Sequence, residues 1–272
     1  MKKTYATATA ITLLATIIIS ITIIVTTIPS TTNNSNQTTY NGVPVYSYSI
    51  IQTYPHDPSA FTQGLTFDNQ GNLIESTGLN GASSLRRVNL VDGQILQQIK
   101  LPEEYFGEGI TIVNNKIIQL TWQNKIGFIY NKETFEKLGE FTYNTEGWGL
   151  TYDSTHLIMS DGTSKLYFLD TNTYQTINSI SVYDGKGFVE NLNELEYING
   201  TIYANIWHSS KIAIINPTTG QVEAYIDLEE TAQPYTTKDP EAVLNGIAYN
   251  AQTKQLYITG KNWSNLYEIA IK

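Results

Sequence analysis

Residue types that can move protons, donate hydrogen bonds and enclose a small ligand recur at equivalent positions of this sequence. A short phrase appears five times: a polar or aromatic residue, a small or acidic residue, and then Leu or Ile. Its first residues are Gln63, Glu108, Trp148, Asn193 and Asn245. A second set follows these phrases by 13 to 16 residues and consists of Ser76, Trp122, Asp161, Trp207 and Lys261. The two sets combine a carboxylate beside glycine (Glu108) for acid–base work with amide and ammonium donors and indole walls.

The interval between the phrases predicts the fold. Successive copies lie 45, 40, 45 and 52 residues apart. A period of about 40–50 residues built from short strands is typical of a β-propeller with one four-stranded blade per repeat. The first two strands of a blade are antiparallel and lie nearest the axis, so the start of one and the end of the other reach the same face. We therefore expect an all-β, five-bladed β-propeller in which both sets surround one opening.

The positions of the tryptophans favour a ligand pocket over ordinary packing between blades. A single tryptophan in a propeller is as often interblade core as ligand contact, and amides at strand starts often satisfy backbone groups. Three of the four tryptophans in the chain nevertheless fall in the two sets, and Trp263 lies two residues from Lys261. This coincidence favours a pocket for a small, partly apolar ligand.

The fifth repeat is short by one strand. It offers Ile247–Asn250, Gln255–Thr259 and Asn265–Ile271. The alternating run Val45–Tyr54 has no repeat of its own and is expected to add the outer strand of this blade, which would close the ring and cover open sheet edges. The longest interval contains the polar insertion Glu229–Ala242, which we expect to form a loop at the mouth.

The amino-terminal part differs from the rest. Lys2 and Lys3 precede Tyr5–Ile28, an uncharged run of 24 residues without Gly or Pro, and about 20 apolar residues cross a membrane core. Its length favours an uncleaved anchor over a cleaved signal peptide, and the two lysines place the remainder outside the cytoplasm. We expect a signal or transmembrane segment over 1–29, a flexible Thr/Asn/Ser-rich stalk over 30–42 and one catalytic domain over 43–272. The expected localisation is extracytoplasmic, either membrane-anchored or secreted, with membrane contact through the amino-terminal segment only.

The composition of the chain argues against several classes of function and of site. The chain has 25 acidic against 16 basic residues and a formal net charge of −9, without the basic stripe that nucleic-acid binding requires. It has no cysteine, so it has no thiol nucleophile and no disulfide, and a closed monomeric propeller would depend on packing alone. The histidines, His56, His156 and His208, include no pair with metal-ligand spacing. We expect no catalytic metal and no cofactor, with a structural calcium on backbone carbonyls and Asn side chains left open.

Seven phrases, in order, resemble the plant-type glutaminyl cyclases, also called glutaminyl-peptide cyclotransferases. They are Ala60-Phe61-Thr62-Gln63-Gly64-Leu65, Tyr105-Phe106-Gly107-Glu108-Gly109-Ile110-Thr111, Gly147-Trp148-Gly149-Leu150, Asn193-Glu194-Leu195-Glu196-Tyr197, Ala204-Asn205-Ile206-Trp207, Asn245-Gly246-Ile247-Ala248 and Thr259-Gly260-Lys261-Asn262-Trp263. The resemblance spans Val45 to the last residue. It implies a five-bladed propeller that converts the N-terminal glutamine of peptides or proteins into pyroglutamate and releases ammonia, without the catalytic zinc of the animal enzymes.

The resemblance also implies roles for particular residues. The essential glutamate of the family matches Glu108. Its substrate pocket matches Phe61, Gln63, Phe106, Trp122, Trp148, Asn193, Trp207 and Lys261. Because the α-amine attacks the γ-amide carbon of its own residue, the nucleophile is already tethered, and one carboxylate could carry the proton from amine to leaving ammonia. Glu108 is the expected shuttle, and Gln63, Asn193 and Lys261 are candidate donors.

Two other function classes stay open. A non-catalytic extracytoplasmic propeller could use the same mouth to bind peptides or glycans. A lactonase- or glycosidase-like hydrolase is the second class. Glycoside hydrolysis would need a second carboxylate beside Glu108. Glu194 holds the slot that is Gly in the other phrases, and strand alternation predicts that it points away from the axis.

Overall fold

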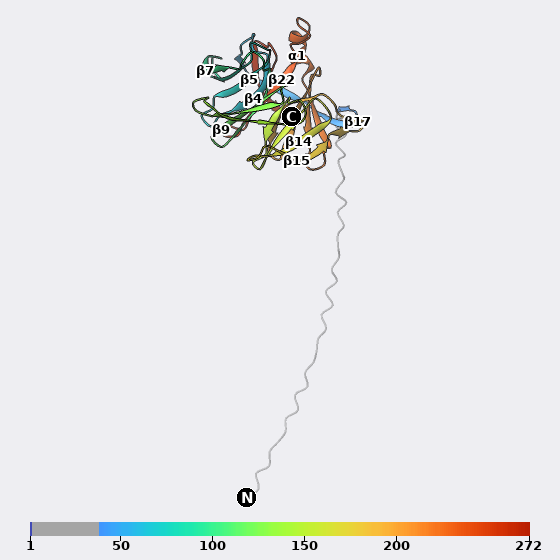
Figure 1. The fold of residues 1–272 in the computed structure, drawn as a ribbon. Coiled ribbons are helices and arrows are strands. Elements are labelled where there is room, and N and C mark those ends of the chain that lie inside the picture. The colour runs from blue at the N-terminus through green and yellow to red at the C-terminus, as the bar shows by residue number, and fades with distance from the viewer. Residues whose placement is uncertain (2–37) are drawn as a thin grey trace. The chain divides into compact units, whose positions relative to one another are not determined.

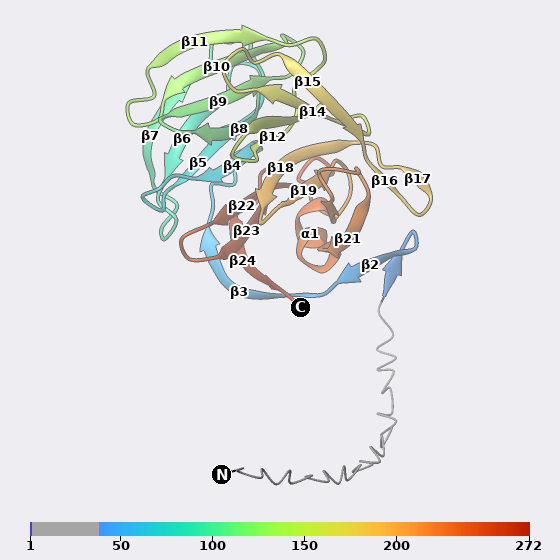
Figure 2. The ribbon, with the colours of Figure 1, turned by 90° about the horizontal axis from the view of Figure 1, so that it is seen from below.

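Five sheets surround a common axis in the computed structural model, which describes Met1 and residues 38–272 (Figures 1 and 2). This part of the chain is therefore an all-β, five-bladed propeller, as the phrase spacing predicts. The expected segment over 1–29 and nearly all of the stalk lie outside the described residues. Within residues 38–272, no helix is long and apolar enough to cross a membrane.

Three blades are each built from four consecutive antiparallel strands, the first of which lies innermost. Blade one contains β4 (Thr62–Phe67), β5 (Leu73–Thr77), β6 (Ser84–Val88) and β7 (Ile95–Lys100). Blade two contains β8 (Gly107–Val113), β9 (Lys116–Thr121), β10 (Ile126–Asn131) and β11 (Lys137–Thr142). Blade three contains β12 (Leu150–Tyr152), β13 (His156–Ser160), β14 (Lys165–Asp170) and β15 (Thr176–Ser181).

The other two blades recruit strands from the amino-terminal side. Blade four contains β18 (Leu192–Ile198), β19 (Thr201–Ile206), β20 (Lys211–Ile215), β21 (Val222–Asp227), and outside them β2 (Val43–Tyr46) and β1 (Thr39–Tyr40). Blade five contains β22 (Leu244–Asn250), β23 (Gln255–Gly260), β24 (Asn265–Ile271) and β3 (Tyr48–Pro55). A separate hairpin of β16 (Tyr183–Asp184) and β17 (Gly187–Phe188) precedes blade four.

Ring closure follows the prediction in blade five and departs from it in blade four. β3 pairs antiparallel with β24 and supplies the missing outer strand (Figure 2). The single expected strand Val45–Tyr54 is wrong in its bounds, because Val45 and Tyr46 instead pair in parallel with Tyr225 and Ile226 of β21. Without this segment, β21 of blade four and β24 of blade five would both have unpaired backbone groups at the outer edge. β2 covers the first edge and β3 covers the second.

The insertion after blade four is partly helical. The loop expected over Glu229–Ala242 is wrong for α1 (Glu229–Thr236), whose first turn carries two acidic residues that suit the helix amino terminus. Tyr235 of this helix stacks on Trp263, with ring centroids 4.4 Å apart and planes at 8°. Trp263 is fully buried and donates from Nε1 to the carbonyl of Ala242. It is thus core and holds the insertion on blade five.

Apolar side chains fill the spaces between adjacent blades. Between blades one and two, for example, Ile74 and Leu85 pack with Ile110, Ile117 and Phe128. Each of these residues is at most 2% exposed. Burial of apolar area at about 25 cal/mol per Å² is the main favourable term that holds neighbouring sheets together.

The innermost strands approach one another closely at the axis, and glycine in the repeated phrase makes this approach feasible. A Cβ on Gly64 would lie 2.6 Å from the backbone nitrogen of Ile110, and one on Gly109 would lie 2.5 Å from that of Leu150. Gly109 N–H also donates to the carbonyl of Trp148 (2.6 Å), which links blades two and three directly. Any side chain at these positions would push the blades apart.

Two carboxylates of β18 lie on the axis and connect blades that are distant in sequence. Glu194 accepts from the backbone N–H of Leu65 in blade one (3.2 Å) and of Ile247 in blade five (2.8 Å). Glu196 accepts from Tyr249 N–H in blade five (2.9 Å). The expectation that Glu194 points away from the axis is therefore wrong. A β-bulge in β18 shifts its register against β19 and breaks the alternation on which that expectation rested.

A buried ion network connects the closing strand to blade one. His56, directly after β3, donates to the carbonyl of Trp263 (2.7 Å) and to Glu75 (3.0 Å), so both ring nitrogens carry protons. Arg86 donates to Glu75 (2.8 Å) and to Asp57 (2.7 Å). Burial by itself would raise the pKa of Glu75, but Arg86 and His56 hold it at about 2. The network fixes the segment that leads from β3 into β4.

Removal of residues 1–55 tests the closure. The loss of β1, β2 and β3 would expose the long edges of β21 and β24, and unpaired edges associate. We expect an aggregating protein by size-exclusion chromatography with light scattering. A chain that begins at residue 36 serves as the control and should be monodisperse. A soluble monomer with an unchanged unfolding temperature after removal of 1–55 would contradict this account of closure.

Glu196 tests the axial carboxylates through pH. Burial raises its pKa to about 8, so the folded protein retains a proton that the unfolded chain, with a pKa of about 4.3, releases earlier. The stability from this group is full below the unfolded pKa and is lost as pH rises through about 8. We expect Glu196→Gln, which stays neutral, to raise the thermal unfolding temperature relative to the wild type at pH 9 and to change it little near pH 5.

The exposed Glu136→Gln on blade two is the matched control and should show no such pH trend. A Glu196→Gln effect that is the same at pH 5 and pH 9 would mean that the carboxyl is ionised in the folded protein throughout.

Candidate active site

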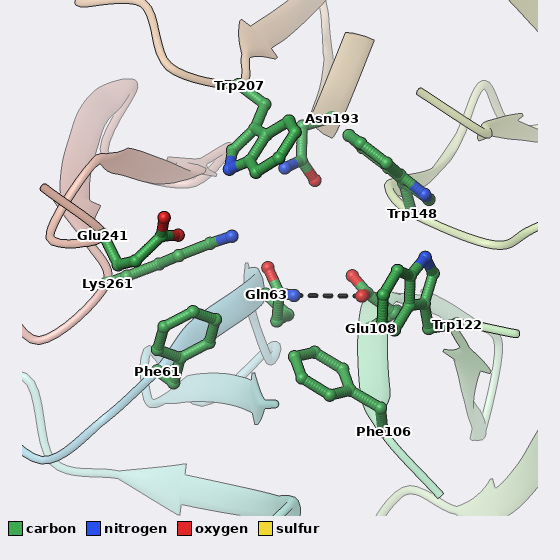
Figure 3. Close-up of a pocket in the computed structure, with 10 residues that line it drawn as sticks. All are labelled: Phe61, Gln63, Phe106, Glu108, Trp122, Trp148, Asn193, Trp207, Glu241 and Lys261. Atoms are coloured by element: carbon green, nitrogen blue, oxygen red, sulfur yellow. Dashed lines mark hydrogen bonds between the residues drawn. The ribbon is translucent and has the colours of Figure 1, made fainter. Parts of the chain in front are cut away.

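Ten side chains enclose one cavity of about 190 Å³ at the end of the axis where the innermost strands begin (Figure 3). They are Phe61, Gln63, Phe106, Glu108, Trp122, Trp148, Asn193, Trp207, Glu241 and Lys261. All nine site residues expected from the sequence are therefore brought together. Glu241 is an addition that sequence reasoning missed.

The starts of innermost strands and the ends of second strands supply most of these side chains. Gln63, Glu108 and Asn193 lie on β4, β8 and β18, near the starts of innermost strands. Trp122 and Trp207 follow directly after β9 and β19, the second strands of their blades. Because neighbouring strands run antiparallel, these starts and ends meet at one face, as the sequence analysis expects.

Three members of the two sets do not line the cavity. Asn245 is fully buried and donates to Oε1 of Gln63 (3.0 Å) and to the carbonyl of Thr62 (2.9 Å). Ser76 accepts from the amide of Gln119 (2.8 Å). Asp161 accepts from the hydroxyl groups of Thr145, Thr163 and Tyr167. The expectation that these three ring the opening is wrong, because their short side chains are used in local hydrogen bonds.

Glu108 is 4% exposed and faces the cavity. The Nε2 of Gln63 donates to its Oε1 atom (3.0 Å), as Figure 3 shows. Gln63 is itself oriented, because its Oε1 accepts from Asn245. A chain of amides thus fixes the rotamer of the carboxyl while leaving its second oxygen toward the cavity.

Opposing effects set the charge of the pocket. Burial raises the pKa of Glu108 well above its usual range, Lys261 lowers it and Glu146 raises it further. Burial lowers the pKa of Lys261, while Glu108 and Glu241 raise it. The Lys261 Nζ lies 4.7 Å from the centroid of the Phe61 ring, which gives the cation a favourable contact. A carboxyl group whose pKa is raised by burial in a pocket is a candidate for general acid–base catalysis.

Glu146 holds two walls of the pocket and was also missed by sequence reasoning. Its Oε2 atom accepts from Nε1 of Trp122 (2.7 Å) and of Trp148 (3.0 Å). Trp148 in turn meets the edge of Trp207, with centroids 5.6 Å apart. The sequence contains a feature that could have identified Glu146. This residue directly precedes the Gly147-Trp148 phrase, and indole N–H groups that face one pocket need a hydrogen-bond acceptor.

One fully buried side-chain oxygen of the site has no hydrogen bond. The Oδ1 atom of Asn193 is buried without a partner in the part of the chain that the structure describes. The same is true of Gln119 Oε1, Asn205 Nδ2 and Asn245 Oδ1, which lie outside the cavity. The unpaired oxygen is therefore a feature of the crowded inner strands and does not by itself indicate a ligand.

Within the described residues, no cluster of three or more His, Cys, Asp or Glu side chains could hold a metal ion. Whether the protein uses a metal or cofactor thus stays a prediction from sequence.

Comparisons with known proteins cover most of the chain. Residues 20–271 match the model of the family described as glutamine cyclotransferase. A glutaminyl-peptide cyclotransferase of Arabidopsis thaliana is 40% identical over 227 residues, which cover 82% of this chain and 71% of that protein. The crystal structure of Myxococcus xanthus glutaminyl cyclase superimposes with a TM-score of 0.78 at 36% identity and covers 84% of this chain and 97% of that one.

The family match spans far more than half of the chain, and both relatives share more than a third of its residues over most of its length. The solved relative also agrees with the five-bladed architecture described above. This chain belongs to the glutamine cyclotransferase family.

Proposed function

We propose that this protein is a glutaminyl-peptide cyclotransferase, which closes the N-terminal glutamine of a peptide or protein into pyroglutamate and releases ammonia. The observation that carries the proposal is a single buried carboxyl, Glu108, in a small aromatic cavity whose wall also contains amide groups and one lysine. Membership of the family and the names of the two relatives support it. The cavity suits one glutaminyl residue.

Binding would place both reacting groups of the substrate beside Glu108. The α-amine and the γ-amide belong to the same residue, so the pocket need only hold one side-chain rotamer for attack. The amide of Asn193, which lines the cavity, would form a hydrogen bond with the substrate. The indoles of Trp122, Trp148 and Trp207 would clamp the side chain and exclude water, which would otherwise hydrolyse the amide.

The reaction then needs one proton to move, through Glu108, from the attacking nitrogen to the leaving nitrogen. The amine nitrogen forms a bond to the γ-amide carbon, and the amide oxygen of the resulting tetrahedral species carries negative charge. Glu108 takes the proton from the attacking nitrogen and gives it to the departing NH₂ group, so the C–N bond breaks with loss of neutral ammonia. Lys261 is the one cation of the pocket wall and would stabilise the oxyanion.

The raised pKa of Glu108 suits this role. An N-terminal amine has a pKa of about 7.7–8.0, far above that of an ordinary glutamate. Burial raises the pKa of Glu108, so its carboxylate is a stronger base toward the amine than that of an ordinary glutamate. Gln63, expected as a candidate donor to substrate, donates from Nε2 to Glu108 and would position the shuttle, while the second N–H of this amide stays a candidate donor.

The alternative functions have less support. A non-catalytic peptide or glycan binder would not need a desolvated carboxyl, whose burial costs free energy. Glycoside hydrolysis needs a second carboxylate across the bond, and Glu194 is occupied by two backbone amides on the axis.

Glu108→Gln tests the proposed chemistry. Glutamine keeps the size and the hydrogen bond from Gln63 but cannot carry the proton. We expect turnover of a glutaminyl dipeptide to fall by about 10²–10⁴-fold, the usual effect of a positioned acid–base group, with the unfolding temperature unchanged or higher. Ammonia release in the presence of a strong chelator is the measurement.

Glu136→Gln, an exposed carboxylate directly before β11, is the control and should turn over like the wild type. Near-wild-type activity of Glu108→Gln would refute the shuttle. Absence of ammonia release by the wild type would refute the function.

Lys261→Met tests the coupling between Lys261 and Glu108. The cation lowers the pKa of Glu108, so its removal should raise that pKa. The acid limb of the kcat/KM profile, which reports the free enzyme, should therefore move to higher pH. Lys238→Met, an exposed lysine of the insertion, should leave the limb in place. An unmoved limb in Lys261→Met would mean that another group controls it.

A further inference from the structure

Glu241 is the pocket residue to which the cyclisation chemistry assigns no role. It lies near the end of the insertion after β21 and lines the cavity beside Lys261 (Figure 3). Its side chain is 53% exposed, whereas Glu108 is 4% exposed. Glu241 is thus a carboxylate of the rim, open to solvent and to whatever part of the substrate leaves the pocket.

The contacts of Glu241 leave it available to a ligand. Its one ion-pair contact within the described residues is with Nε2 of His208, at 3.7 Å, and the His208 side chain is 46% exposed. A pair that is this open to solvent, with a histidine that is charged only when protonated, adds little stability. A cation of the substrate could replace it at small cost.

Other loops at this end of the propeller add negative charge. The segments that lead into β8, β18 and β22 open at the mouth, because these strands begin there. They carry the exposed carboxylates Glu103, Glu104, Glu190 and Glu230. These four carboxylates outnumber the exposed lysines of the same segments, Lys186 and Lys238. A net negative rim raises the local concentration of cationic ligands.

The proposed reaction decides which part of the substrate meets this rim. Both the α-amine and the γ-amide of the glutamine must enter the cavity, so its main-chain carbonyl leads out. A cavity of about 190 Å³ is smaller than the roughly 300–1,000 Å³ of common ligand pockets. It has room for one residue. The side chain of the second residue is therefore the first group outside.

We propose, on the basis of the function above, that Glu241 makes this enzyme selective for glutaminyl peptides whose second residue is Lys or Arg. The carboxylate forms an ion pair with the ammonium or guanidinium group at the rim. An acidic second residue meets repulsion from Glu241 and from the neighbouring rim carboxylates. Glu241 is a specificity residue and takes no part in the proton transfer.

The test compares three peptide amides, Gln-Lys-Gly, Gln-Ala-Gly and Gln-Glu-Gly, by the kcat/KM of ammonia release. We expect the Lys peptide to exceed the Glu peptide by about fivefold at low salt, as partly exposed ion pairs give. The ratio should approach one near 1 M salt, where the screening length is about 3 Å. Glu241→Gln should lower the low-salt ratio, and Glu241→Lys should invert it. Glu136→Gln, an exposed carboxylate directly before β11 and outside the rim, should keep the wild-type ratio and rate.

Each other result counts against the proposal. Equal turnover of the three peptides by the wild type, or the same ratio in Glu241→Gln and Glu241→Lys as in the wild type, would overturn the assignment and leave the cyclotransferase function standing. No ammonia from any of the peptides would overturn both.

Discussion

The close approach of the innermost strands at the axis is the constraint on which the rest of this structure depends. The phrase glycines allow backbone to contact backbone, as between Gly109 and Trp148. The same crowding removes Glu108, Glu194 and Glu196 from water, and burial raises the pKa of all three carboxyls. The architecture thus creates desolvated acids, and their hydrogen bonds decide what each acid does.

The structural and the reactive carboxyl differ in what they bind. Glu194 accepts from backbone amides of blades one and five, so its oxygens are held by groups that cannot move without opening the ring. Glu108 receives one donor, the side-chain amide of Gln63, and otherwise faces the cavity. A carboxyl with a fixed rotamer and a free oxygen is suited to proton transfer, whereas one whose oxygens are both occupied stabilises the fold.

The rim of the pocket and its inner walls come from different parts of the chain. Amides on the innermost strands and aromatic side chains in the segments next to strands form the inner walls, where Glu146 accepts hydrogen bonds from two indoles. Glu241 comes from an insertion anchored by the stack of Tyr235 on Trp263. Chemistry therefore rests on the repeated core, and selectivity rests on a segment that can vary without disturbing the blades.

The sequence alone determined the elements that repeat. The spacing of the five phrases predicts the blades, and strand direction places Glu108 and the tryptophans at one mouth, because both are periodic properties of a regular sheet. Only the tertiary structure decided what breaks the period: the bulge that turns Glu194 inward, the division of 43–55 between two blades, and the helix of the insertion. The positions of Glu146 and Glu241 belong with these. They depend on contacts between segments distant in sequence, which leave no periodic trace.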